Sequence, residues 1–332
     1  MRLYVVRLSV LDQSPVPEGS TPSEALRNSI ELAAHADELG YYRYWVAEHH
    51  GMHGLAGSSP EILIGHIAQS TKYIRVGSGG VMLSHYSPLK VAENFKVLEA
   101  LHPNRIDLGL GRAPGSDART AFAFQSTGNA SGSENYLESV LALRQLLNGN
   151  PIQTGPLSGV EALPTTPSAP EMWLLASSDG SASVAAHCGL PLSWAHFING
   201  NGAPICDLYR SHYSPSEEHP NPSVSVGVSV LCADTKEQAQ QMLSSLELWR
   251  SSGLRGPIPD TSNIKDVNEE FNDLRFHSPS RPMVIGTPEN VKDQLCTIAD
   301  TYDAEELLLV TICYSHSQRL RSYELIAEAF NS

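Results

Sequence analysis

Three short segments carry residue types that could bind or activate a small molecule. The first is Glu48-His49-His50, which places two imidazoles beside a carboxylate. Imidazole changes charge near neutral pH, so His49 is predicted to act as a general acid or base or to contact a ligand. Two other interpretations stay open. A metal site would need three or more N or O ligands from several strands, and a packed histidine would do no chemistry.

The second segment, around residues 176–182, has the features of a phosphate site. Ser177, Ser178 and Ser181 offer hydroxyl donors where a helix begins, and unpaired N–H groups at a helix start attract anions. Arg112, on a loop after Gly111, could grip phosphate oxygens with two parallel hydrogen bonds. The alternatives are an ordinary serine cap for the helix and a salt bridge from Arg112 to Asp117.

The third segment interrupts a strand pattern with Gly79 and Gly80, which often marks a close approach of the backbone to a ligand. Met82 could supply an apolar wall beside a flat ring, although a plain turn and a core methionine remain open. Weaker pocket candidates follow other predicted strands or lie on loops nearby: Asp12, His50, His85 and His196.

Short apolar runs alternate with amphipathic helices along the whole chain. Strands are predicted at 3–11, 44–47, 74–77, 105–110, 172–176, 190–195, 224–232 and 306–311. Helices are predicted at 22–39, 60–72, 88–101, 134–147, 182–188, 204–213, 236–249, 288–301 and 318–330. Eight such steps favour an α/β fold, a (β/α)₈ TIM barrel with insertions in its βα loops. In that fold the candidate residues gather at the carboxyl ends of the strands.

Composition narrows the class of protein. There are 22 Lys+Arg and 36 Asp+Glu, a net charge of −14, which disfavours nucleic acid or an anionic membrane as a partner. The five cysteines form no CxxC pair, no apolar run approaches 20 residues, and no signal peptide is recognisable. We therefore expect a cytoplasmic protein with one domain over 1–332. Residues 253–282 are expected to be an insertion or mobile lid, and 113–132 a further lid candidate.

Six ordered segments resemble the single-chain members of the bacterial luciferase-like, flavin-dependent monooxygenases. Among them are GYYRYWVAEHH, IRVGSGGVMLSHYSPLKVAENF, NRIDLGLGRAPGSD and SSDGSASVAAHCGLPLSWAHF. The resemblance implies a TIM barrel, usually a homodimer, with FMN at its mouth. A separate reductase would supply reduced FMN, which reacts with O₂ to a flavin C4a-hydroperoxide that oxygenates a small organic substrate, an aldehyde in the luciferases proper. A deazaflavin-dependent dehydrogenase and a non-catalytic flavin-binding protein on the same barrel are the alternatives.

The resemblance also implies roles for individual residues. His49 matches the catalytic imidazole beside the flavin, and Arg112 matches the phosphate-gripping arginine. The loop with Ser177, Ser178 and Ser181 matches the phosphate loop, and relatives carry a non-proline cis peptide at the position of Gly79–Gly80. The sequence departs from the family at Ala176, Asp179, Gly180 and Ser84-His85-Tyr86.

Overall fold

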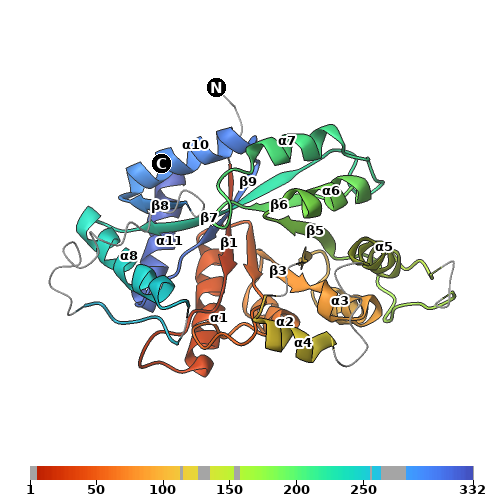
Figure 1. The fold of residues 1–332 in the computed structure, drawn as a ribbon, viewed down its shortest axis with the longest axis horizontal. Coiled ribbons are helices and arrows are strands. Elements are labelled where there is room, and N and C mark those ends of the chain that lie inside the picture. The colour runs from red at the N-terminus through yellow and green to blue at the C-terminus, as the bar shows by residue number, and fades with distance from the viewer. Residues whose placement is uncertain are drawn as a thin grey trace.

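A closed ring of parallel strands forms the centre of the molecule (Figure 1). The computed structural model describes residues 6–112, 115–125, 135–152, 158–254, 256–262 and 282–331. Each strand pairs in parallel with its neighbours, and β6 pairs with β7 to close the ring. The ring contains eight strands: β1 (Arg7–Asp12), β2 (Arg43–Val46), β3 (Arg75–Met82), β4 (Ile106–Gly111), β5 (Glu171–Ala176), β6 (Leu192–Ala195), β7 (Val224–Cys232) and β9 (Glu306–Val310). The predicted (β/α)₈ barrel is thereby confirmed.

A ninth strand, β8 (Met283–Gly286), lies outside this ring and was missed by the sequence analysis. The first part of β7 pairs with β6 and β9, whereas its last residues, Ser229–Cys232, pair with β8. Its apolar run, Met283–Ile285, is only three residues long and does not alternate with polar residues, so it produced no readable strand pattern.

Helices cover the outside of the ring (Figure 1). Two of them begin with capping boxes, at Thr21 with Glu24 and at Thr235 with Gln238, which satisfy backbone N–H groups that would otherwise lack partners. The helices of the described part of the chain are α1 (Pro22–Glu38), α2 (Pro60–Ser70), α3 (Pro88–Leu101), α4 (Ala118–Gln125), α5 (Tyr136–Leu147), α6 (Asp179–Cys188), α7 (Ala203–Ser211), α8 (Lys236–Ser251), α10 (Pro288–Tyr302) and α11 (His316–Asn331), and a 3₁₀ turn, η1, spans Leu83–His85.

The segments predicted as lids are described only in part. Helix α4 lies within 113–132 and was not predicted, and most of 253–282 falls outside the described residues. Ile258, which is described, is fully buried and exchanges backbone hydrogen bonds with Val16 and Glu18 at 2.8 and 2.7 Å. This part of the predicted insertion therefore packs on the loop after β1.

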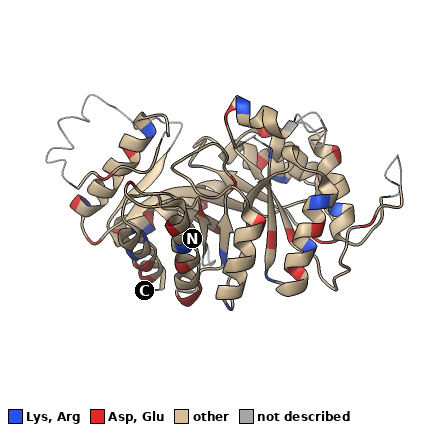
Figure 2. Cartoon of the chain, turned by 90° about the horizontal axis from the view of Figure 1, so that it is seen from below, with Lys and Arg blue, Asp and Glu red and all other residues tan. Residues whose placement is uncertain are grey.

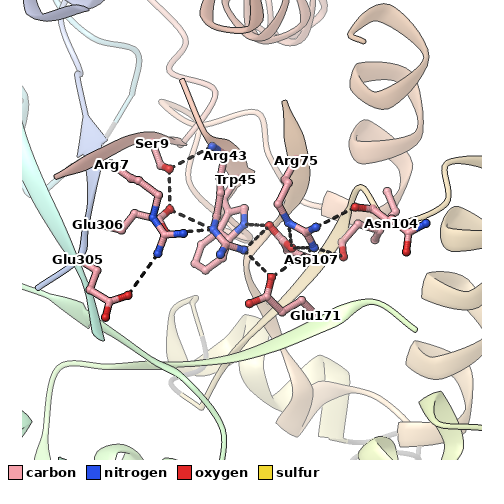
Figure 3. A network of polar contacts seen from close by, with 11 residues as sticks. Arg7, Ser9, Arg43, Trp45, Arg75, Asn104, Asp107, Glu171, Glu305 and Glu306 are labelled. Carbon is pink, nitrogen blue, oxygen red and sulfur yellow. Dashed lines mark hydrogen bonds and ion pairs between the residues drawn. The ribbon is translucent and has the colours of Figure 1, made fainter. Parts of the chain in front are cut away.

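The amino-terminal end of the barrel is filled by a network of charged side chains (Figure 3). Arg43 is 2% exposed and bonds Glu306, Asp107 and Glu171 at 2.9–3.1 Å. The Trp45 indole donates to Asp107 at 2.9 Å. Because every charge here has an opposite partner, this end of the barrel is closed by paired groups.

The outer surface carries both signs of charge. Figure 2 shows acidic residues distributed along the outer helices with basic residues among them. Within the described part of the chain, no helix combines the length and the apolar character needed to cross a membrane.

Candidate active site at the carboxyl end of the barrel

A cavity of about 540 Å³ opens at the carboxyl ends of the strands, opposite the charged network. In barrels of this fold, that end carries the ligand-binding loops. Its walls combine serines and glycines with apolar side chains. The lining residues include Leu11, Gln13, Ala47, Glu48, His49, Gly79, Gly80, Met82, Gly111, Arg112, Leu175, Ala176, Ser177, Ser178, Ser181, Ser193, Trp194, Phe197 and Ile198.

One end of the cavity joins the loop after β4 to the start of α6. Ser178 is the N-cap of α6, and its side chain makes no capping hydrogen bond. A Cβ built on Gly180 would lie 3.0 Å from Nη1 of Arg112, so the guanidinium lies directly over the first turn of the helix. A permanent cation and the positive end of a helix dipole therefore face the same space.

The absence of a side chain at position 180 makes room for Arg112. A side chain there would compete for the space that the Arg112 guanidinium fills. Asp179 is exposed, accepts the Gly180 N–H at 2.8 Å, and lines a different hollow on the outside of α6. Its carboxylate is thus turned away from the cavity that Arg112 lines.

The alternative partner for Arg112 is otherwise engaged. Asp117 accepts hydrogen bonds from the backbone N–H of Arg119, and from both the N–H and the hydroxyl of Thr120, at 2.8–3.0 Å. Among the residues that the structure describes, no carboxylate pairs with the Arg112 side chain. The guanidinium is therefore available to an anion.

The middle of the cavity has a wall of bare backbone. The Gly79–Gly80 peptide bond is cis, as the resemblance implied. A Cβ on Gly79 would lie 2.5 Å from Cδ1 of Leu11, and one on Gly80 would lie 2.6 Å from the Gly109 carbonyl oxygen. A side chain at Gly80 would collide with the Gly109 backbone, and one at Gly79 would displace Leu11, so glycine leaves bare backbone that a flat ring can approach closely.

His49 lines the cavity as a neutral imidazole. Burial lowers the pKa of His49 to about 4, with the Glu48 carboxylate opposing this shift and His50 adding to it. Within the described residues, its buried Nδ1 atom has no hydrogen-bond partner. An unpartnered buried nitrogen beside a cavity can accept a hydrogen bond from a ligand or donate one to it.

Glu48 has a role that the sequence analysis did not assign. Its carboxylate is fully buried and accepts hydrogen bonds from the Met82 N–H at 3.0 Å, the Tyr86 hydroxyl at 2.8 Å and His50 Nε2 at 2.7 Å. Two of these donors, Met82 and Tyr86, come from the end of β3 and the segment after it, and His50 lies in the same loop as Glu48. Glu48 therefore fixes the loop after β3 relative to His49, its neighbour in sequence.

The weaker pocket candidates are separated by the structure. Met82 lines the cavity, whereas Asp12, His50, His85 and His196 are absent from its described lining. Asp12 is buried against Arg319 and accepts the Tyr44 hydroxyl at 2.6 Å. The sequence predicts that these residues lie near strand ends. It does not predict whether their side chains point into the cavity.

The three histidines have partners elsewhere. His50 bonds Glu48, and His196 Nδ1 lies 2.9 Å from the Tyr302 hydroxyl. His85 stacks on Phe124 with a ring-centre distance of 4.6 Å, next to a second hollow between α3 and α4.

Two further features, one in the cavity and one near Arg112, carried no readable sequence signal. Phe197 and Ile198, from the loop after β6, give one side of the cavity an apolar wall. Tyr136, at the start of α5, has a buried hydroxyl without a partner among the described residues. Burial raises the pKa of Tyr136, and the Arg112 cation opposes that shift, which places the two groups near each other.

The metal interpretation of the Glu48-His49-His50 segment finds no support in the geometry. Over the described ranges, no group of three or more His, Cys, Asp or Glu side chains is arranged to hold a metal ion.

Comparison with known proteins identifies the family. A family model described as luciferase-like monooxygenase matches residues 5–305. The chain is 43% identical to the protein YwcH of Bacillus subtilis (strain 168), covering 98% of this chain and 99% of that protein. It is 33% identical to the N-acetyl-S-alkylcysteine monooxygenase of the same organism, covering 98% of each.

Solved structures agree with this assignment. Apo-MsnO8 is 41% identical and superposes with a TM-score of 0.89 over 98% of both chains. Two more distant structures share the fold alone. The oxygenating constituent of 3,6-diketocamphane monooxygenase of Pseudomonas putida, in complex with FMN, is 17% identical, with 98% and 97% coverage and a TM-score of 0.72. An F420-dependent secondary alcohol dehydrogenase is 14% identical, with 98% and 99% coverage and a TM-score of 0.68. The chain belongs to the luciferase-like monooxygenase family.

Proposed function

We propose that this protein is an FMN-dependent monooxygenase that uses O₂ to oxygenate a small organic substrate. One observation carries the proposal. Arg112, which has no carboxylate partner among the described residues, lies over the first turn of α6 at one end of the cavity that His49 lines. The cavity thus has an anion site at one end and a wall of bare backbone in its middle. A cofactor with a phosphate group and a flat ring would fit both features.

The residues of the cavity fit FMN. Arg112 and the serines of the α6 loop would hold its phosphate, and Gly79–Gly80 with Met82 would flank its ring. Reduced FMN would supply the electrons with which O₂ is activated. The chain itself would exclude water with its apolar walls, which protects reactive species in such sites.

His49 would handle the proton. Because it is neutral above about pH 5, its unpartnered Nδ1 can either accept a proton or, in the other tautomer, donate a hydrogen bond to the reacting groups. Glu48 holds the neighbouring loops in place, so His49 would face the ring from a fixed position.

Several finer parts of the proposal follow the family resemblance. They are a separate reductase as the source of reduced FMN, a homodimer, a cytoplasmic location and a lid role for 253–282 within a single domain. The other candidate cofactor is a deazaflavin, since an F420-dependent dehydrogenase shares the fold. Parallel titrations with FMN and the deazaflavin would separate the two, because tighter deazaflavin binding and O₂-independent turnover would overturn the monooxygenase assignment.

The decisive experiment compares two flavins that differ only in the phosphate. We expect Arg112→Ala to weaken FMN binding about 10- to 100-fold and riboflavin binding by less than about 3-fold, because a hydrogen bond to a charged group contributes about 1.5–3 kcal/mol. Both dissociation constants are measured by quenching of flavin fluorescence. Arg119→Ala, which removes an exposed arginine that does not line the cavity, is the matched control. Equal losses for both flavins would place the phosphate elsewhere.

A further inference from the structure

The side chain of Gln13 reaches the cavity from the end of β1. Successive side chains of a strand point to opposite faces, and Leu11, two residues earlier, also lines the cavity. Asp12, between them, points the other way and pairs with Arg319 of α11. The Gln13 carboxamide forms no hydrogen bond to another described residue, so within that part of the chain its donors and its acceptor are left for a ligand.

The backbone on both sides of Gln13 is held in place. Asp12 is fully buried, pairs with Arg319 and accepts the Ser14 N–H at 2.7 Å. Ser14 has a φ of 50°, in the left-handed region that residues other than glycine seldom adopt, and its hydroxyl lies 2.9 Å from that of Ser29 in α1. Such a conformation persists only where the surrounding structure imposes it, often at a ligand site. Gln13 is therefore presented to the cavity from a fixed position.

Gln13 lies far around the ring from the phosphate end. The strands follow one another in order from β1 to β6, so the serine loop after β5 is four strands from β1, the largest separation in a ring of eight. The Gly79–Gly80 wall belongs to β3, and His49 follows β2. A ligand group that contacts Gln13 therefore lies beside His49, on the side away from the bare-backbone wall.

The chemistry of a carboxamide defines what it can recognise. The group is neutral and carries an acceptor oxygen next to NH₂ donors. Another carboxamide satisfies both functions at once through two hydrogen bonds, whereas an ester offers only acceptors. A site that is built to bond a donor discriminates against an analogue that lacks it, because the site's own polar atoms are then left unpaired.

We infer that Gln13 binds a carboxamide group of the substrate and places it beside His49. This inference rests on the proposed function, since it assigns the phosphate end and the bare-backbone wall to FMN. Gln13 is then a specificity-determining residue of the site, and it selects the substrate by hydrogen bonding.

The test uses 2-phenylacetamide and methyl phenylacetate, which differ only in the group attached to the carbonyl. Their dissociation constants are measured by ligand-detected NMR on the full chain, with and without oxidised FMN. We expect the wild type to bind the amide at least about 10-fold more tightly than the ester. Gln13→Leu, which removes the polar atoms, should reduce this preference below about 2-fold. Gln240→Leu, on an exposed position of α8 outside the cavity lining, should keep it.

A second variant changes the class of ligand. Gln13→Glu replaces the carboxamide with a carboxylate of the same shape, so it should bind the ammonium form of 2-phenylethylamine at least about 10-fold more tightly than the wild type does. Unchanged amine binding in Gln13→Glu, with a native circular dichroism spectrum, overturns the inference.

The remaining outcomes are distinct. Equal binding of amide and ester by the wild type overturns the inference, as does an amide preference that survives in natively folded Gln13→Leu. FMN and riboflavin affinities are recorded in the same samples and should change less than about 2-fold in Gln13→Leu. A larger loss for both flavins would assign Gln13 to the flavin ring and overturn the inference. An intact amide preference in a wild type that does not bind FMN would count against the proposed cofactor and not against Gln13.

Discussion

The two ends of this barrel treat their charged groups in opposite ways. At the amino-terminal end, Arg43 is buried among three carboxylates at hydrogen-bond distance. At the carboxyl end, within the described residues, the Arg112 guanidinium has no carboxylate partner and the Nδ1 atom of His49 has no hydrogen-bond partner. The first arrangement stabilises the fold, and the second leaves interactions to be completed by ligands. The same strands therefore carry stability at one end and chemistry at the other.

The largest expected effect comes from breaking the amino-terminal network. Arg43→Met leaves Glu306 and Asp107 buried without their central cation, and unpairing a buried charge costs about 3–5 kcal/mol. We expect the free energy of unfolding in urea to fall by that amount. FMN affinity of the remaining folded protein should change less than about 2-fold.

A matched control lies in the same network. Arg7→Ala removes an ion pair to Glu305 whose side chains are 40% and 63% exposed, so its effect should stay below about 1 kcal/mol. Similar losses for Arg43→Met and Arg7→Ala would show that burial does not distinguish the two pairs. If Arg43→Met does not fold, Arg43→Met with Glu306→Gln, which also removes one unpaired charge, should recover part of the stability.

The carboxyl end should respond to pH through His49. Its pKa is about 4 in the folded chain against 6.5 for an ordinary histidine. Between these values the unfolded chain binds more protons, so this contribution is complete above about pH 6.5 and is lost as the pH falls toward 4. Each pKa unit corresponds to about 1.4 kcal/mol, so the contribution is at most about 3.5 kcal/mol.

The contribution of His49 can be isolated with a substitution. The difference in the free energy of unfolding between pH 7 and pH 4.5 should be smaller in His49→Gln than in the wild type. An identical difference in both proteins would mean that His49 is not a buried neutral imidazole.

Catalysis should depend on the same side chain. We expect His49→Ala to retain FMN affinity within about 2-fold and to lose turnover by about 100-fold or more, the usual contribution of a general acid or base. Turnover is measured as product formed from photoreduced FMN and O₂ with a substrate that the wild type oxygenates. Wild-type turnover in the variant would remove His49 from the mechanism.

The smallest expected effect concerns a carboxylate near the phosphate end. Asp179 is exposed and faces away from the cavity, yet it lies in the first turn of α6. Asp179→Asn removes a negative charge from the neighbourhood of the phosphate and should tighten FMN binding by about 2- to 5-fold, less so at high salt. Weaker FMN binding would mean that Asp179 helps to order the loop.

The sequence predicts the barrel because the alternation of strands and helices is long and regular. The same reasoning missed β8 and α4, which have four and eight residues and too little apolar repetition to stand out. The pairing of β6 with β7 closes the ring of strands and makes the fold a barrel. The alternation of strands and helices favours this closure but is also compatible with an open sheet.

Some of the predicted site residues line the cavity, and others do not. Arg112, His49 and the serines share one cavity because each directly follows a strand of the ring. Asp12 ends β1 and His196 directly follows β6, but their side chains have partners in α11 and α10. The sequence predicts at which end of the barrel a residue lies. The orientation of its side chain depends on which neighbouring groups can form hydrogen bonds or ion pairs with it. The glycines that make room for Trp194 and Phe197 act across the structure, so no local pattern reveals them.

The hydrogen bonds to the Glu48 carboxylate affect which substitutions nearby this protein can tolerate. Because one side chain receives hydrogen bonds from Met82, Tyr86 and His50, these positions are energetically coupled, and substitutions among them should not be additive. The unusual Ser84-His85-Tyr86 segment is part of that unit, since Tyr86 supplies one of the bonds. A graft that moves this loop into another barrel therefore needs a carboxylate at the position of Glu48 to receive the bonds from Met82 and Tyr86.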